Sequence, residues 1–178
     1  MGTALNIIDR RRTAACLLAV AFLAAGCASR PLSDNALERV ADLGALRQEA
    51  LALVNQSRRA EGLPALRMSG PLDAAAQAHA EDMARRGFFG HRSPEWNDVA
   101  ARYRASGGGA WRVIAENITQ CSGCGATRGQ VAAFHEGWLA SPGHRRNILD
   151  PRVEAFGFGM ASAAGKVYAV QTFVGERD

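Results

Sequence analysis

The first 26 residues decide how much of this chain is available to fold. Arg10, Arg11 and Arg12 form a positive block, and an unbroken run of apolar or small residues extends from Ala14 to Ala25. Such a run is too short to cross a bilayer as a helix, whereas a secretory signal combines a positive block with a short apolar segment. We therefore expect residues 1–26 to form a removable signal peptide.

The apolar run leads into a cysteine. Residues 23–27 have the sequence LAAGC, which resembles the cleavage site of bacterial lipoproteins and implies that Cys27 is acylated and becomes the mature N-terminus. The two residues directly after Cys27 are Ala28 and Ser29 and neither is an Asp, so we expect a lipid anchor in the outer membrane. Ala24 stands where that site usually has leucine, so cleavage by an ordinary signal peptidase is the alternative. Twin-arginine export is disfavoured because only the arginines of that motif are present.

The chain that remains carries little net charge. Residues 1–26 contain three Arg and one Asp, which leaves 18 basic and 16 acidic residues and a net charge of +2. That balance is too small for nucleic-acid binding. We interpret residues 27–44 as a polar tether and residues 45–178 as one domain, long enough to bury a core. We expect a monomer that meets the membrane through its lipid anchor.

Apolar residues at helical spacing come early in the domain, and strand patterns come late. Helices are predicted over residues 45–60, 71–86 and 127–140, with a shorter one carrying Val99 and Tyr103. A strand is predicted over residues 111–119, and a closing hairpin over residues 155–162 and 166–174. This order favours an α+β fold rather than a parallel sheet.

Cys121 and Cys124 lie in the segment CSGCG, which predicts a tight loop. Cysteines of an exported protein meet an oxidising compartment, which favours a local disulfide. A redox role would need the first cysteine at a helix N-terminus, and Gly123 and Gly125 disfavour a helix there. We expect the disulfide, and a redox or metal-binding pair is the alternative.

Four histidines are candidates for chemistry. His79 and His135 lie on the apolar faces of predicted helices, and we interpret them as structural. His91 lies in the loop FFGHRSPE, and His144 follows a helix in SPGHRRNIL. Gly- and Pro-rich loops leave the backbone free to present a side chain to a ligand. His91 and His144 are therefore the functional candidates, although their spacing alone does not bring them together.

Four separated segments together resemble one family. LVNQSRRAEGLPALRMSGPLDAAAQAHAEDMARRGFFGHRSP is followed by AENI, by WLASPGHRRNIL and by QTFVG, in this order. They resemble the CAP superfamily of cysteine-rich secretory proteins, antigen 5 and pathogenesis-related proteins, from about Leu46 to Gly175. The resemblance implies an SCP domain, which is an α-β-α sandwich with a central antiparallel sheet flanked by helices.

The resemblance also implies a cleft in which two His and two Glu can hold a divalent metal. By position these are His91, Glu116 and His144, while Ser141 stands where animal members have the second Glu. Glu136 is a weak substitute, because five residues along a helix is about 140° around its axis. We expect the three matching residues to bind zinc weakly, and more weakly at low pH, since imidazole must be neutral to bind metal.

Two functions fit these residues. The first is a binding module that holds a small molecule or an envelope component in the cleft, without catalysis. The alternative is a metal-dependent or serine-type hydrolase, with Ser141 as nucleophile, His144 as base and Glu116 as orienting group. Ser141 before Pro142 also has the plainer role of ending a helix. The resemblance does not decide between them, because the family is linked to lipid binding, protease activity and signalling without one shared reaction.

Overall fold

The computed structural model describes residues 35–177, so the predicted signal peptide and residues 27–34 of the predicted tether, Cys27 among them, lie outside the described residues. The elements follow one another in this order: β1 (Leu37–Glu38), α1 (Leu43–Ala60), β2 (Arg67–Met68), α2 (Gly70–Arg86), α3 (Val99–Ala105), β3 (Trp111–Ser122), α4 (Arg128–Ala140), α5 (Pro142–Ile148), β4 (Ala155–Ala163) and β5 (Lys166–Glu176).

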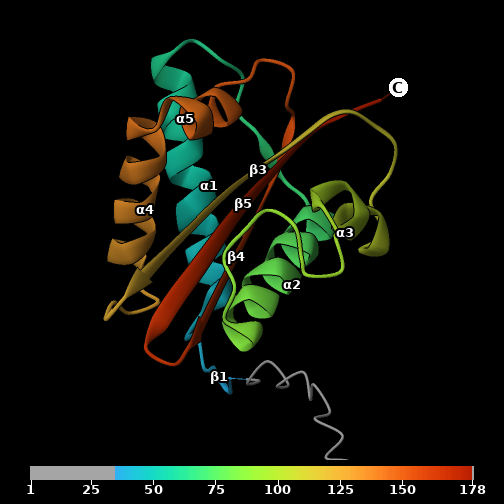
Figure 1. Ribbon diagram of the computed structural model, residues 1–178. Helices are drawn as coiled ribbons and strands as arrows, with labels where there is room; N and C mark the ends of the chain where they lie inside the picture. Colours follow the sequence, from blue (N-terminus) through green and yellow to red (C-terminus); the bar gives the residue numbers. More distant parts are fainter. Residues whose placement is uncertain (1–34, 178) are drawn as a thin grey trace, which may run out of the picture.

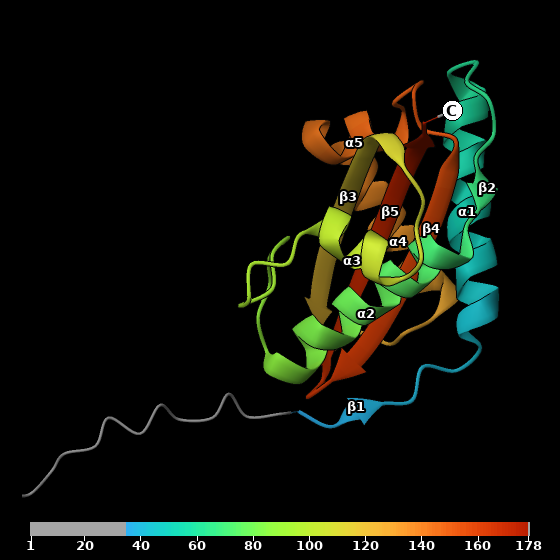
Figure 2. The same ribbon diagram turned by 90° about the vertical axis from the view of Figure 1, so that its right-hand side faces the viewer.

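One sheet lies between two layers of helices. Its strands are ordered β1-β4-β5-β3 with antiparallel neighbours, and the short β2 pairs in parallel with β4. Figure 1 shows α2 and α3 on one face of the sheet and α1, α4 and α5 on the other, and Figure 2 gives the view along a perpendicular direction. The predicted α+β fold, an α-β-α sandwich with a central antiparallel sheet, is confirmed.

Strand β4 has large apolar side chains on one face and glycines on the other. Phe156, Phe158 and Met160 belong to the core that the sheet shares with α1 and α4. The intervening Gly157 and Gly159 face α2, where an added Cβ would collide with the helix backbone at Leu72–Asp73 and Ala76–Gln77. Successive residues of a strand point to opposite faces, so this alternation lets α2 lie directly on the sheet.

The predicted helices α2 and α4 form as their terminal residues indicate. Pro71 lies in the first turn of α2, and Gly87 ends the helix with a left-handed φ of 66°. The Thr127 side chain caps α4 by accepting a hydrogen bond from Gln130 N at 3.2 Å. A proline at the start, a glycine at the end and a threonine cap are favoured because they satisfy or avoid unpaired backbone groups.

The boundary between tether and domain differs from the expectation. Strand β1 lies within residues 27–44 and pairs with β4. Helix α1 begins at Leu43 rather than at residue 45, because the Asp42 carboxylate accepts from Ala45 N at 3.0 Å and caps the helix. Gly44 is therefore inside the helix, and the last part of the expected tether belongs to the fold.

Two further expectations on element bounds were wrong. Helix α5 was not predicted: Pro142 in its first turn starts a new helix immediately after α4, so His144 lies on a helix and not in a loop. Strand β3 continues beyond residue 119, because Cys121 and Ser122 still pair with Val167 and Lys166 of β5.

Among the described residues, none of the helices is both long and apolar enough to span a bilayer.

Candidate functional site

Glu116 is the centre of the candidate site. It lies on β3 opposite Thr172, and its side chain is only 3% exposed. Its Oε1 lies 3.0 Å from His91 Nδ1, and its Oε2 accepts a hydrogen bond from Arg102 Nη2 at 2.7 Å. An ionised carboxylate can only accept, so Nδ1 of His91 donates in this contact, and in the neutral imidazole Nε2 keeps its lone pair.

Arg102 connects this carboxylate to the loop that carries His91. The guanidinium donates from Nη1 to the Asn97 carbonyl at 2.7 Å and from Nη2 to the His91 carbonyl at 3.2 Å. Its Nε is buried and has no hydrogen-bond partner among the described residues. One side chain on α3 therefore fixes both the loop and the orientation of Glu116.

His79 lies beneath the same carboxylate. Its Nε2 is 2.9 Å from the Gly90 carbonyl and 3.9 Å from Glu116 Oε1, and its side chain is fully buried. Burial lowers the pKa of His79 and outweighs the opposing effect of Glu116. The histidine interpreted as structural does hold the loop at Gly90, and it also lies beside the buried carboxylate of Glu116.

Helix α5 contributes Asn147 to the site. Its Nδ2 donates to the Glu116 carbonyl at 3.3 Å and to Asn117 Oδ1 at 2.8 Å. Asn117 in turn donates to Gln171 Oε1 at 3.1 Å and to the His144 carbonyl at 3.2 Å. A chain of amides therefore joins α5 to β3 and β5, and it fixes the position of Asn147.

An open pocket of about 320 Å³ lies over Glu116. It is lined by His91, Arg92, Asp98, Val99, Ile114, Ala115, Glu116 and Asn147. The structure thus places His91 against Glu116, while His144 does not contribute to the lining. Burial, and then the charge of His91, lower the pKa of His144, so this imidazole lies within electrostatic reach of the pocket.

The residues of the alternative hydrolase do not assemble. Glu116 is bonded to His91 and Arg102, so within residues 35–177 it forms no hydrogen-bonded triad with Ser141 and His144. Ser141 joins α4 to α5, and its side chain does not cap α5. Glu136 is exposed on α4 and does not line the pocket. A serine nucleophile is therefore not supported.

The residues present do not fit the expected zinc ion. The guanidinium of Arg102 occupies Oε2 of Glu116, and the protonated Nδ1 of His91 occupies Oε1. A metal would have to displace the Arg102 guanidinium from a buried carboxylate. Breaking a buried ion pair has a large cost in free energy. Within the described part of the chain, no three His, Cys, Asp or Glu side chains are grouped as metal ligands.

The other residues singled out by the sequence lie away from the pocket. Nε2 of the buried His135 is 2.8 Å from Ser57 Oγ on α1, and burial lowers the pKa of this histidine. Cys121 and Cys124 are joined by a disulfide between the end of β3 and the loop that follows it. Both features connect segments of the core and do not contact the pocket.

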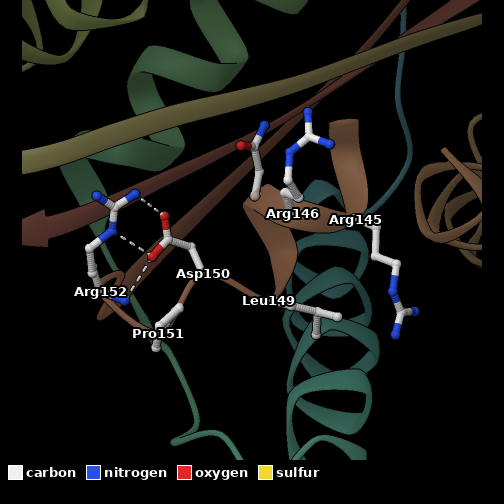
Figure 3. A pocket seen from close by; sticks show the side chains of 7 residues that line it. Arg145, Arg146, Leu149, Asp150, Pro151 and Arg152 are labelled. Carbon is white, nitrogen blue, oxygen red and sulfur yellow. Dashed lines mark hydrogen bonds and ion pairs between the residues drawn. The ribbon is translucent and has the colours of Figure 1, made fainter. Parts of the chain in front are cut away.

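A second hollow, of about 520 Å³, lies at the C-terminal end of α5. Figure 3 shows Arg152 held by Asp150, while Arg145 and Arg146 extend from the helix in different directions. Arg145 pairs with Glu61 at 2.7 Å, whereas Arg146 has no ion-pair partner among the described residues. Asn147 lines both hollows, so they are neighbours.

Sequence reasoning missed Arg102 and Asn147. Asn147 follows His144 by three residues, so recognition of α5 as a helix would have placed both side chains on one face. Arg102 gave no comparable signal, because its partners Glu116 and His91 lie on other elements. Only the folded arrangement of α3 beside β3 reveals its role.

The fold and the order of the segments agree with one family. The model of the CAP family, described as the Cysteine-rich secretory protein family, matches residues 51–174, so this chain belongs to that family. The chain is 28% identical over 134 residues to the uncharacterized protein YkwD of Bacillus subtilis (strain 168), covering 75% of this chain and 49% of that protein. It thus spans about half the length of this curated relative.

Solved structures show the same fold. An extracellular protein containing an SCP domain from Bacillus anthracis str. Ames is 27% identical with a TM-score of 0.63, over 75% of this chain and 41% of that one. An outer surface protein from Borrelia burgdorferi is similar in fold, with 13% identity and a TM-score of 0.66. The match covers 80% of this chain and 99% of that one. NaASP2, crystallised with Zn²⁺, is 12% identical with a TM-score of 0.55. The match covers 72% of this chain and 78% of that one.

Proposed function

We propose that this chain is an exported, lipid-anchored binding module of the cell envelope, and that its ligand occupies the pocket over Glu116. The observation that carries the proposal is the preorganised carboxylate, bonded to both His91 and Arg102 beneath an open pocket of about 320 Å³. Polar groups held by their neighbours pay little entropy on binding, which favours recognition of a ligand. The extracellular SCP-domain relative supports export.

The ligand of this proposal is a small polar molecule with an acidic group. His91 Nε2 and the amide of Asn147 supply hydrogen-bonding groups in the pocket, and Asn147 also borders the second hollow. Arg146 lines that hollow without an ion-pair partner among residues 35–177. A carboxylate or phosphate on the ligand would pair with this guanidinium in a charge-assisted hydrogen bond.

The test is native mass spectrometry of the full chain extracted from the envelope in mild detergent. A bound small molecule is expected on the wild type and on Arg128→Ala, an exposed arginine at the start of α4. It should be lost from Asn147→Ala and His91→Ala, and weakened about tenfold or more in Arg146→Ala, as for loss of a charged hydrogen bond. Equal retention by all variants, or no adduct on any, contradicts the proposal.

A second candidate function is hydrolysis by an activated water. The observation that favours it is the contact between Glu116 and His91 Nδ1, which leaves Nε2 able to accept a proton, as in a base held by an orienting carboxylate. A panel of ester, amide and glycoside substrates should then show turnover that falls at least a hundredfold in His91→Gln and is unchanged in Ser141→Ala. Turnover that depends on Ser141 would contradict this assignment.

A further inference from the structure

Three large apolar side chains are exposed on the described part of the chain. They are Leu37 with 39% of its surface exposed, Phe89 with 48% and Trp96 with 74%. Single exposed apolar residues are common, but a group of them at one place marks a contact with a partner or a membrane. Their positions relative to one another therefore decide what they mean.

All three residues are connected to the last turn of α2. Asn35, two residues before Leu37, donates to the Arg85 carbonyl at 2.7 Å and to the Ala84 carbonyl at 3.2 Å. Phe89 follows this helix after Gly87. The carboxylate of Glu95, next to Trp96, is bonded to Arg86 at 2.7 and 2.9 Å.

Figure 2 shows β1 and the last turn of α2 at the same end of the molecule. The start of the described chain and the loop that carries the two exposed aromatic residues are therefore both joined to this end of α2.

The turn that carries Trp96 is held by hydrogen bonds and has a strained backbone. Trp96 N donates to the Ser93 carbonyl at 2.8 Å, Asn97 N donates to Ser93 Oγ, and the Trp96 backbone has a left-handed φ of 65°. A bulky residue rarely adopts this φ, and a held outlier of this kind is a sign of function. The guanidinium of Arg92 lies 5.5 Å from the centre of the Trp96 ring. The strained turn fixes an indole that is largely exposed.

We propose that this end of the domain, defined by Leu37, Phe89 and Trp96, rests on the lipid surface of the membrane to which the chain is attached. The inference uses the lipid anchor at Cys27 from the proposed function. Asn35 is the eighth residue after Cys27, and eight peptide steps span at most about 29 Å. The surface beside Asn35 is thereby kept close to the bilayer.

The chemistry of the surface agrees with a bilayer interface. Trp is favoured where an apolar ring meets water and lipid headgroups, and the arginine beside it can lie among phosphates. The neighbouring charges are largely neutralised, because Arg86 pairs with Glu95 and Asp82, and Arg85 pairs with Glu81. Shallow insertion of aromatic rings is therefore expected rather than attraction to anionic lipid.

Quenching of tryptophan fluorescence by brominated lipid tests the contact. The full chain is reconstituted on phosphatidylcholine vesicles whose acyl chains carry bromine near the headgroup. Quenching is expected in the wild type and in Trp111→Phe, and it should be lost in Trp96→Phe. Phe89→Ser should reduce it, and addition of anionic phosphatidylglycerol should leave it unchanged. Trp138 is buried and serves as the unquenched background.

Flotation of the vesicles reports attachment separately from contact. A chain that floats but shows the same quenching with and without Trp96 overturns the proposal, as does a chain that floats without quenching. A chain that does not float contradicts the anchor; its Cys27 thiol is then coupled to a maleimide phospholipid, and the same quenching measurement decides. The adduct found by native mass spectrometry depends on Asn147 and not on Trp96, so failure of the pocket proposal is distinguishable.

Discussion

At the scale of single residues, Arg102 is the side chain on which the site depends. Its side chain is 10% exposed and that of Glu116 is 3% exposed, so Arg102→Met leaves a buried carboxylate without its cation. We expect the free energy of unfolding to fall by about 3 kcal/mol, the usual cost of breaking a buried pair from one side. Urea denaturation of the two proteins measures this difference.

The matched control is Arg85→Met on α2. Arg85 pairs with Glu81 at 3.6 Å, but the two side chains are 41% and 33% exposed. An exposed pair contributes about 0.5 kcal/mol, so this variant should unfold almost as the wild type does. Equal losses in the two arginine variants would mean that Arg102 acts through general packing and not through Glu116.

Arg102→Met also tests why the site does not fit zinc. In the wild type the guanidinium occupies the carboxylate, so titration calorimetry should detect no zinc site at His91 and Glu116. Removal of the guanidinium frees Oε2 for a metal, and Arg102→Met is expected to bind zinc when imidazole is neutral. Zinc binding by the wild type that is lost in His91→Ala would contradict this reading of the site.

Two buried histidines give the stability of the fold a dependence on pH. Burial lowers the pKa of His79 and of His135 below the value of 6.5 that applies to the unfolded chain. Their contribution is fully present above about pH 6.5 and is lost as the pH falls below it, because the unfolded chain then binds protons that the folded chain resists. We expect the melting temperature to fall between pH 7.5 and pH 5.

The share of one histidine is measured by substitution. Each such group adds a slope of at most about 1.4 kcal/mol per pH unit to the free energy of unfolding. His135→Gln should reduce the slope measured by urea denaturation at a series of pH values, since burial is the cause that lowers the pKa of His135. An unchanged slope in this variant would show that other groups cause the loss of stability at low pH.

The residues of the site were only partly predictable. His91 was found because a Gly- and Pro-rich loop predicts an exposed, functional imidazole. His144 was assigned to a loop, and because α5 was not recognised, Asn147 on the same helix was missed as a pocket residue. The partnership of Arg102 with Glu116 joins α3 to β3, and such a pair between elements leaves no periodic pattern in a sequence.

At the scale of elements, the contact of α2 with the sheet depends on Gly157 and Gly159. Gly157→Ala would drive a methyl group into the backbone at Leu72 and Asp73. Overpacking of a core costs about 1–3 kcal/mol, and here the obstacle is backbone, so we expect a loss of about 3 kcal/mol. Thermal unfolding followed by circular dichroism measures it.

A glycine in open space provides the control. An added Cβ at Gly137 on α4 meets nothing within 4 Å, so Gly137→Ala should stabilise the protein by about 0.5–1 kcal/mol through helix propensity. If Gly157→Ala were as harmless as Gly137→Ala, the close approach of α2 to β4 would be wrong. Opposite signs in the two variants support it.

The elements themselves show what a local pattern can establish. Helix α2 has Pro71 at its start and Gly87 after its end, and each acts through its own backbone, so the helix was predictable. Strand β1 is two residues long and exists because β4 offers it a partner more than a hundred residues away. Pairing of that kind depends on the fold and not on local propensity.

At the scale of the whole molecule, the proposed attachment to the envelope would depend on Cys27. The prediction is that Cys27→Ser moves the protein to the soluble fraction or leaves it unprocessed, because acyl chains on the cysteine bury methylene groups in the bilayer. Fractionation of cells and the intact mass of the mature protein measure the result. Unchanged membrane retention and an unchanged mature mass would contradict the prediction.

Tension applied through the anchor would enter the sheet at one edge only. Strand β1, where the described chain begins, and β3, which carries Glu116, are the two ends of the order β1-β4-β5-β3. A pull on the N-terminal segment therefore loads the few bonds of β1 and Asn35 first, and within the sheet it must cross β4 and β5 before it reaches the strand of Glu116. Under such a load β1 would separate from β4 before β3, at the opposite edge, is disturbed.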